Sequence, residues 1–253
     1  MYDIDTRKRA LALVSQGRSL NSVSKQTGIS RHAITCWLER IDPLPRALGS
    51  PPRSKPDDLA AYSYLLGLYL GDGHISAHTR GSGYYLRITC ADAWPGLIEE
   101  CRAAILAVHN ECTAYLVQRQ GCVNVTSSSQ SWPVLFPQHG PGRKHERHIV
   151  LEKWQQDIVD THPWEFIRGL VHSDGCRNMN WTTRLVGGER KRYEYPRYWF
   201  TNVSDDIRKL YTDTLDTLGV EWKDCTRHGQ PYNISVARRA SVALMDAHVG
   251  PKY

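Results

Sequence analysis

The stretch that decides the fold is residues 65–73, LLGLYLGDG, which recurs 102 residues later as residues 167–175, IRGLVHSDG. Each copy places small residues four positions apart, and this spacing forms a smooth stripe along one side of a helix. Two such stripes allow two helix backbones to approach each other closely. Each copy then ends in Asp-Gly, which is typical of a helix C-terminus. The repeat therefore predicts two paired helices whose last residues, Asp72 and Asp174, lie side by side.

The similarity between the two copies continues downstream of the motif. A β-like run at residues 84–89, before Asp92, corresponds to residues 198–203, before Asp205, and an amphipathic helical stretch follows each run. Residues 123–125 then correspond to residues 232–234. The chain from residue 58 to residue 253 is thus predicted to be two copies of one αββαββα unit, with a longer first hairpin in the second copy, at about residues 177–196.

Paired acidic residues at two helix ends have a direct electrostatic consequence. Carboxylates at the negative ends of two helix dipoles repel each other unless a cation lies between them. Oxygen ligands at such a point suit Mg²⁺, or Mn²⁺, which keeps waters and phosphate oxygens in its remaining positions. We therefore predict a divalent-metal site at Asp72 and Asp174, together with the preceding residues Gly71 and Ser173.

The two motifs resemble the LAGLIDADG motif of the homing endonucleases, in the single-chain form with two motifs, and the resemblance covers residues 58–253. It implies an α+β body with pseudo-two-fold symmetry, in which two saddle-shaped antiparallel sheets lie over double-stranded DNA. It also implies that Asp72 and Asp174 hold divalent metals that activate water and stabilise the leaving oxygen at each scissile phosphate. Position six of the motif, often Asp in the family, is Leu70 in one copy and His172 in the other, but that position is not a metal ligand in the family.

Two lysines extend the resemblance. Lys144 lies in the glycine-rich segment 140–144, which resembles the family's loop with a catalytic lysine, and Lys252 is its counterpart in the segment 250–252. The resemblance implies that both lysines lie at the catalytic periphery. The alternative for each is a solvated lysine on the surface.

The excess positive charge of the chain is confined to its N-terminal part. Residues 1–56 contain ten Lys and Arg against four Asp and Glu, whereas residues 57–253 contain 22 of each. Five of the 13 prolines fall between residues 43 and 56, where they disfavour helix. We therefore expect a small basic domain at residues 1–48, a proline-rich linker at 49–57, and the two repeats at 58–150 and 151–253.

The basic N-terminal domain is predicted to contain three short helices, at residues 6–16, 20–27 and 31–40, with Ile34, Trp37, Leu38 and Ile41 in its core. The turn at residues 27–30, TGIS, resembles the helix-turn-helix of homeodomain-like transposases and resolvases. This resemblance implies that the third helix enters the major groove of DNA. It would present Arg31, His32 and Thr35 to the base edges. The alternative is a small helical cap that binds no nucleic acid.

The predicted strands supply a second DNA-reading surface. Only half of the side chains on a strand point to one face, so many of the basic candidates are ordinary solvated charges. Acidic residues such as Glu99 are expected on the outer helices. The candidates for DNA contact are His74, Ser76, Arg80, Arg87 and Arg119 in the first copy, and Arg177, Asn180, Arg184, Lys191, Arg192, Arg227, Arg238 and Arg239 in the second copy and its later strands.

Several classes of protein are excluded by the sequence. No apolar stretch approaches the roughly 20 residues that span a bilayer, and the first residues, MYDIDTRKRA, are polar rather than a signal peptide. The seven cysteines form no Cys-x-x-Cys pair, so neither a disulfide framework nor a structural zinc site is indicated. We expect a cytoplasmic, nucleoid-associated bacterial protein that makes no membrane contact and is a monomer with internal pseudo-dimer symmetry.

Two functions follow from these features. The first is a site-specific, divalent-metal-dependent endonuclease for double-stranded DNA. The second is a catalytically silent, DNA-binding transcriptional regulator that uses the same scaffold; regulators of this type generally have degenerate acidic positions, whereas both are present here. A maturase-like RNA-binding role is disfavoured, because A-form RNA hides its major groove from a recognition helix.

Overall fold

The computed structural model describes residues 2–42, 52–79, 81–227 and 229–253. The chain divides into two compact units, Met1–Ser50 and Pro51–Tyr253, and each is described by itself. In the described parts of both units, no helix is long and apolar enough to cross a membrane.

The first unit contains three helices at the predicted places: α1 (Ile4–Ser15), α2 (Leu20–Thr27) and α3 (Arg31–Glu39). Each helix begins after a side chain that caps it, because the side-chain oxygens of Asp3, Ser19 and Ser30 accept hydrogen bonds from backbone N–H groups of the first turn. Gly28 ends α2 in the left-handed conformation, with φ of 71°. Local sequence signals therefore determine all three helix starts.

A small apolar core holds the three helices together. Ile34 and Trp37 are buried as predicted, whereas Leu38 is 53% exposed. Leu38 follows Trp37 by one residue, about 100° around the helix, and this rotation turns its side chain away from the core. Arg7 packs against one end of this core. Its guanidinium donates a hydrogen bond to the Ile41 carbonyl at 2.9 Å and lies over the Trp37 ring.

The second unit, which we call the body, repeats one order of elements twice, as the sequence predicts. The first half contains α4 (Leu59–Asp72), β1 (Gly73–Ala77), β2 (Tyr84–Ala91), α5 (Pro95–Val108), β3 (Ala114–Arg119), β4 (Cys122–Ser129) and α6 (Trp132–Leu135). The 3₁₀ turn η1 (Lys144–Glu146) and α7 (Lys153–Thr161) precede the second half. That half contains α8 (Pro163–Asp174), β5 (Gly175–Val186), β6 (Glu189–Thr201), α9 (Asp205–Thr217), β7 (Lys223–Arg227), β8 (Gln230–Val236) and α10 (Arg239–His248).

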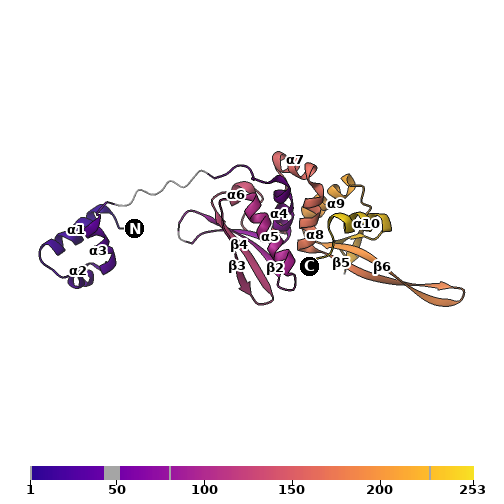
Figure 1. Cartoon of the computed structure of the whole chain (residues 1–253), viewed down its shortest axis with the longest axis horizontal. Coiled ribbons are helices and arrows are strands. Elements are labelled where there is room, and N and C mark those ends of the chain that lie inside the picture. Colours follow the sequence, from indigo (N-terminus) through magenta and orange to yellow (C-terminus); the bar gives the residue numbers. More distant parts are fainter. Residues whose placement is uncertain (1, 43–51, 80, 228) are drawn as a thin grey trace. The chain divides into compact units, whose positions relative to one another are not determined.

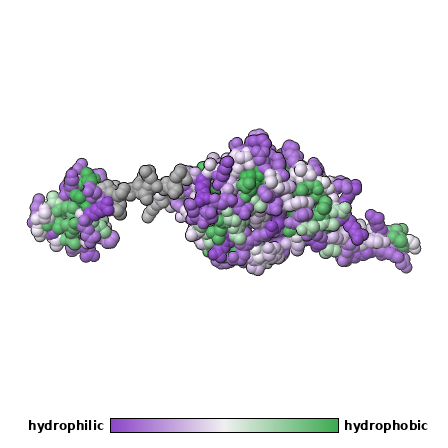
Figure 2. Space-filling view, turned by 45° about the horizontal axis from the view of Figure 1, so that its top comes forward, coloured by the Kyte–Doolittle hydropathy of each residue, from purple (hydrophilic) through white to green (hydrophobic). Residues whose placement is uncertain are grey.

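The strands form two antiparallel four-stranded sheets of the same topology. Their orders are β1-β2-β4-β3 and β5-β6-β8-β7, and the registers correspond, since Gly73 lies opposite Ile88 and Gly175 lies opposite Phe200. The hairpin β5–β6 is longer than its counterpart, as predicted, and it projects from the body (Figure 1). Apolar surface is exposed at the end of this projection (Figure 2), where Leu185 is 71% exposed.

Helices α4 and α8 lie side by side at the centre of the body, between the two sheets (Figure 1). A Cβ atom at Gly67 would lie 2.5 Å from the carbonyl oxygen of Phe166, and one at Gly169 would lie 2.1 Å from that of Tyr64. No side chain fits at either distance. The two helices can therefore pack at this separation only because glycine occupies both positions.

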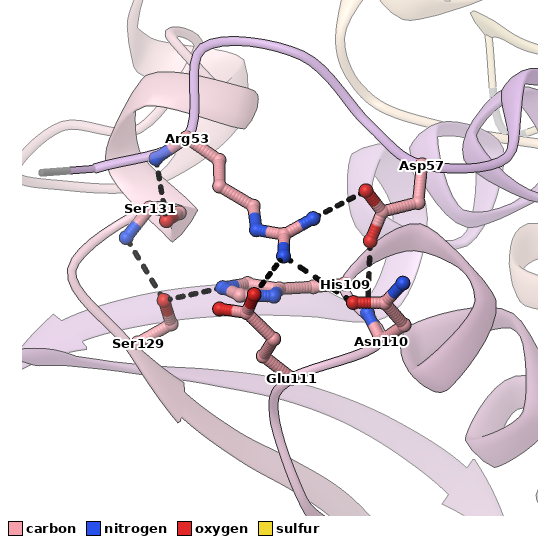
Figure 3. Close-up of polar contacts among 7 residues, drawn as sticks. All are labelled: Arg53, Asp57, His109, Asn110, Glu111, Ser129 and Ser131. Carbon is pink, nitrogen blue, oxygen red and sulfur yellow. Dashed lines mark hydrogen bonds and ion pairs between the residues drawn. The ribbon is translucent and has the colours of Figure 1, made fainter. Parts of the chain in front are cut away.

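The start of the body is fixed by a polar cluster (Figure 3). The backbone N–H of Arg53 donates to Ser131 Oγ at 2.9 Å, and its guanidinium pairs with Glu111 at 2.6 Å and with Asp57. Asp57 in turn accepts a hydrogen bond from the Asn110 backbone at 3.0 Å. Residues 53–57, which the sequence places in the linker, are therefore attached to the body. Residues 49–51 of that linker lie outside the described residues.

Replacing Gly169 with alanine tests the close helix contact. The added methyl group would meet backbone rather than a movable side chain, so we expect Gly169→Ala to lower the unfolding free energy of the body by about 3 kcal/mol, at the upper end for overpacking. Urea denaturation followed by tryptophan fluorescence measures this, because seven of the eight tryptophans lie in the body.

The matched control is Ser173→Ala in the same helix. This change removes only the hydrogen bond from Ser173 Oγ to the Leu170 carbonyl, at 2.9 Å, and adds no atom to the interface. Equal stability losses in the two variants would contradict the assigned role of Gly169.

Candidate active site and nucleic-acid interface

Asp72 and Asp174 are the last residues of α4 and α8, and the close helix contact brings them together. At this end of the pair, a Cβ atom placed on Gly71 would lie 2.2 Å from Ser173 Oγ and 2.9 Å from Asp174 Oδ2. Both carboxylates line one open cavity of about 580 Å³. The convergence of two acidic side chains that the repeat predicts is thus present in the structure.

The two carboxyl groups have raised pKa values. Burial raises the pKa of Asp72 to about 6, and repulsion from Asp174 adds to the effect. Burial likewise raises the pKa of Asp174, while a hydrogen bond from Asn202 opposes that shift. Both groups also face the negative end of a helix dipole. This corner of the body therefore favours a cation.

The two predicted lysines lie at the same corner and make equivalent contacts. Lys144 Nζ donates to the carbonyl oxygens of Leu70 at 3.0 Å and Gly71 at 2.8 Å, and also to that of Tyr69. Lys252 Nζ donates to the Ser173 carbonyl at 2.8 Å. Each ammonium group thus caps the C-terminus of one central helix, a role that the sequence did not suggest. Burial lowers the pKa of Lys144 to about 8 and also lowers that of Lys252.

The donor set at the two aspartates fits a hard divalent cation that keeps part of its hydration. Mg²⁺ and Mn²⁺ are commonly held by one or two carboxylates with waters and phosphate oxygens, and two carboxylates converge here. The carbonyls of Gly71 and Ser173 accept hydrogen bonds from the lysines, so a metal would share them with an ammonium group. Within the described residues, no group of three or more His, Cys, Asp and Glu side chains offers an alternative metal site.

Asn202 is a site residue that the sequence analysis missed. Its Nδ2 donates to Asp174 Oδ2 at 2.6 Å, and its Oδ1 accepts the backbone N–H of Ser204 at 2.8 Å. Asn202 therefore links Asp174 to the start of α9. The repeat could have located it, because it follows Thr201 as Cys90 follows Thr89. The first copy has Cys90 at this position, so the comparison of the two copies did not mark Asn202 as a site residue.

His172, at the sixth position of the second motif, belongs to the core rather than to the acidic corner. It is 2% exposed, and its Nδ1 lies 3.0 Å from the Tyr64 hydroxyl. Burial and the nearby positive charge of Arg168 together lower the pKa of His172 to about 4. The imidazole is therefore neutral near pH 7.

Each sheet has one face packed on helices and one open face, and strand alternation assigns every side chain to one of them. In the first sheet, Leu86 and Ile88 are buried on the helix side, so Arg87 lies on the open face. Its guanidinium donates to Ser76 Oγ at 2.6 Å. The residues of the predicted reading surface that share this open face are His74, Ser76, Arg87 and Arg119.

The second sheet separates the predicted residues by the same rule. Tyr198 and Phe200 are buried on the helix side. The predicted residues on the open face are Asn180, Arg184 and Lys191. Arg177 and Arg192 lie on the helix-facing side instead.

The two helix-facing arginines have partners of their own. Arg177 pairs with Asp246 of α10 at 2.6 Å, and Arg192 pairs with Glu194 at 2.7 Å and stacks over Trp181. We therefore leave Arg177 and Arg192 out of the candidate DNA interface.

The remaining candidates lie outside the strand faces. Arg80 lies outside the described residues, as does the side chain of Arg227, whose backbone ends β7. Arg238 precedes α10 and pairs with Glu221 at 3.0 Å, and Arg239 is the first residue of that helix. In the first unit, the predicted reading residues are all exposed on the first turns of α3: Arg31, His32 and Thr35.

Basic residues outnumber acidic residues in the strands of the body. The eight strands contain ten Lys and Arg but only three Asp and Glu, although the body as a whole is balanced. The first sheet contains no acidic residue at all in its strands. In the second sheet, register places Glu194 and Asp224 on the helix-facing side. Of the three acidic strand residues only Glu189, opposite Val186, lies on an open face, so the open faces present mainly basic and neutral groups, a surface suited to a polyanion.

With this geometry in place, comparison with known proteins defines the class of fold. No protein-family model matches the sequence, and no curated protein matches it. Among solved structures, the body has the fold of the LAGLIDADG homing endonucleases, which confirms the predicted fold class.

The individual structures are distant in sequence. The crystal structure of I-DmoI in complex with DNA and Mn is similar with a TM-score of 0.51 and 15% identity, over 78% of this chain and 99% of that one. Mesophilic variants of the homing endonuclease I-DmoI give the same score and identity, over 76% and 96%. The N-terminal LAGLIDADG domain of DUF199/WhiA gives a TM-score of 0.46 and 10% identity, over 77% and 83%.

Replacing Asp72 with asparagine tests the repulsion between the two carboxylates. Burial, together with repulsion from Asp174, raises the pKa of Asp72 from 3.8 to about 6, so ionised Asp72 lowers the unfolding free energy above pH 6. As the pH falls below about 6, Asp72 takes up a proton in the folded protein and this cost decreases, until it is lost below about pH 3.8. We therefore expect Asp72→Asn to raise the Tm of the metal-free body by about 2–4 °C at pH 8, the change that about 1 kcal/mol produces at this size after allowing for solvent screening. At pH 5 we expect a smaller rise, because part of the cost remains until the pH falls below about 3.8.

Thermal melts in EDTA at the two pH values measure this difference. The matched control is Asp213→Asn, which removes the same charge from an exposed ion pair with Lys209 on α9. A rise in Tm that is equal at pH 5 and pH 8, or equal in the control, would show that the ionised Asp72 carboxylate does not lower the unfolding free energy.

Proposed function

We propose that this protein is a site-specific, double-stranded DNA endonuclease that depends on Mg²⁺ or Mn²⁺ and acts as a monomer. One observation carries the proposal: Asp72 and Asp174 converge at the end of a glycine-packed helix pair, in a body whose open sheet faces are basic. The similar fold of I-DmoI, solved in complex with DNA and Mn, supports the same reading.

The chain's own residues have distinct parts in this chemistry. Asp72 and Asp174 would hold the cation, and Asn202 orients Asp174 through the 2.6 Å hydrogen bond. Lys144 and Lys252 offset the negative charge of the helix ends and of a bound phosphate. When bound, the divalent cation supplies the positive charge that activates water and stabilises the leaving oxygen.

DNA recognition is proposed to combine the two units. The open sheet faces would contact the duplex around the cleavage point, while α3 of the first unit would read bases in the major groove. Because one chain carries both contacts, binding by one unit raises the effective concentration of DNA for the other. The concentration of excess positive charge in residues 1–56 supports this second contact.

Cleavage of selected DNA tests the proposed activity. The full chain is used to select bound duplexes from a random library in EDTA, and Mg²⁺ or Mn²⁺ is then added. We expect double-strand cleavage at a defined position. Asp72→Asn and Asp174→Asn should keep DNA binding but cut at least about 10²-fold more slowly, because a metal ion contributes several kcal/mol to such reactions.

Asp213→Asn is again the matched control, since it removes one negative charge far from the acidic corner, and it should cut like the wild type. Cleavage that survives both active-site changes would contradict the assigned chemistry. Specific binding by the wild type without any cleavage would instead favour the second function, a DNA-binding regulator on this scaffold.

The two sides of the long hairpin provide a test of the interface itself. Arg184 and Lys191 are paired on the open face, while Arg190 and Arg192 lie on the other face of the same hairpin. We expect the Arg184→Gln/Lys191→Gln double variant to bind DNA more weakly and to reduce the salt slope of log K by about 2, or about 1 per lost phosphate contact. Affinity measured between 50 and 200 mM salt gives this slope.

The Arg190→Gln/Arg192→Gln variant is the matched control, because it removes the same charge from the same hairpin. It should retain the wild-type slope. Equal loss in the two variants would show that charge in general, rather than the open face, determines binding.

A further inference from the structure

Arg197 lines a cavity of about 280 Å³ in the second sheet, and it is not among the residues that the sequence indicated for DNA contact. The lining includes Arg197 of β6, Lys223 and Cys225 of β7, and Ser235 of β8. Strand alternation and register place these residues on the open face, opposite to the buried Tyr198. The cavity therefore lies on the side of the sheet that is proposed to contact DNA.

Two aromatic rings hold the Arg197 guanidinium. Tyr195 and Trp199 come two residues before and two residues after it on β6, so all three side chains share one face. The Arg197 Cζ lies 4.8 Å from the centre of the Trp199 ring and 5.4 Å from that of the Tyr195 ring. The Tyr195 hydroxyl is itself held, because Asn180 Nδ2 donates to it at 3.2 Å. Stacking on aromatic faces restrains the plane of a guanidinium and therefore the direction of its donors.

Arg197 has unused capacity to donate hydrogen bonds. Among the described residues its buried Nε has no hydrogen-bond partner, and its Nη2 makes a long contact of 3.5 Å with the Tyr195 hydroxyl. Glu221, the acidic residue of the cavity lining, already pairs with Arg238 at 3.0 Å. An arginine with free donors suits a ligand that carries acceptor atoms, because it then recovers the hydrogen bonds that it lost on leaving water.

The fixed direction of these donors selects among the acceptors that duplex DNA presents. A guanidinium has donors only, and guanine is the base that presents two neighbouring acceptors, N7 and O6, in the major groove. Adenine presents an amino donor beside its N7, so it would face the guanidinium with a donor. A phosphate contact positions the protein and requires no fixed plane, since flexible side chains make it as well. The restrained guanidinium of Arg197 therefore favours a base over the backbone.

We propose that Arg197 is a specificity-determining residue that binds N7 and O6 of one guanine in the major groove, with Tyr195 and Trp199 holding its guanidinium in plane. This assignment rests on the proposed binding of duplex DNA by the open sheet faces. A bidentate contact of this kind favours guanine over the other bases by about tenfold or more. Arg197 thus determines one base pair of the target and takes no part in the chemistry at the aspartates.

A modified base tests the contact with the wild-type protein. The full chain selects duplexes from a random library in EDTA, and each guanine of the selected site is then replaced in turn by 7-deazaguanine, which lacks the N7 acceptor. We expect binding about tenfold weaker at one of these guanines, because a donor of Arg197 loses its partner. Arg197→Met should bind the modified and unmodified duplexes equally. A guanine N7 that matters equally to both proteins would overturn the assignment.

Three variants separate base readout from general charge. Arg197→Met should relax the selection at one position and keep the preferences elsewhere. Arg197→Lys keeps the charge but not the planar fork, so it should lose the guanine preference as well. Arg192→Met is the matched control, because Arg192 lies on the same strand and stacks over Trp181, but on the helix-facing side. It should retain the wild-type preference.

The outcomes distinguish this assignment from the proposed function. Binding that weakens equally for all sequences, with the salt slope of log K reduced by about 1, would show a phosphate contact and overturn the assignment. Unchanged base selection in Arg197→Met would overturn it too. A wild-type protein that selects no sequence would instead overturn the proposed site-specific function. Because misfolded protein lowers the bound fraction of every duplex alike, the base preference of the folded fraction still reports on Arg197.

Discussion

The body depends on one constraint, the contact between the backbones of α4 and α8. Gly67 and Gly169 leave no room for a side chain, so the helices meet backbone to backbone. This contact determines how far apart the two helix ends lie, and thereby the separation of Asp72 and Asp174. A fold held by glycines at its centre has little freedom to adjust this separation, because neighbouring backbone cannot move aside as a side chain can. The same contact that joins the two halves therefore sets the geometry of the acidic corner.

Bringing two carboxylates to two helix C-termini has an electrostatic cost, and the chain offsets it with positive charge from elsewhere in the sequence. Lys144 follows the first half and Lys252 follows the second, and each reaches back to the carbonyl groups of one central helix. Two aspartates and two ammonium groups thus form a compact cluster without formal net charge. Burial raises the pKa of Asp72 to about 6 and lowers that of Lys144 to about 8, so the cluster retains its balance only between these pH values. The lysines stabilise the helix ends whether or not they also act on a substrate.

Features that depend on neighbouring residues in the sequence could be predicted, whereas features that depend on strand register could not. Helix ends depend on neighbouring residues such as Ser19, Ser30 and Gly28, and the paired aspartates depend on a motif that occurs twice, so both could be predicted. The face on which a strand residue lies depends on register, where a shift of one residue reverses the outcome. Arg177 and Arg192 were therefore candidates from sequence, although the structure places them on the helix-facing side. Leu38 was misplaced for a similar reason, since one residue rotates a helical side chain by about 100°.

Asn202 could not be predicted for a different reason. The repeat identifies the two aspartates, but it does not identify the residues that lie next to them. Duplication makes matched positions visible only where both copies keep the same residue, and here one copy has Asn202 and the other has Cys90. The linking segment differs as well: α9 begins three residues after Asn202, whereas α5 begins five residues after Cys90. A homodimer would have to carry any such change in both of its sites. Because both halves of this body belong to one chain, the residues around the two aspartates can differ while the shared helix contact stays unchanged. The contact between α4 and α8 thus requires glycine in both halves, whereas the residues that surround the two aspartates can differ.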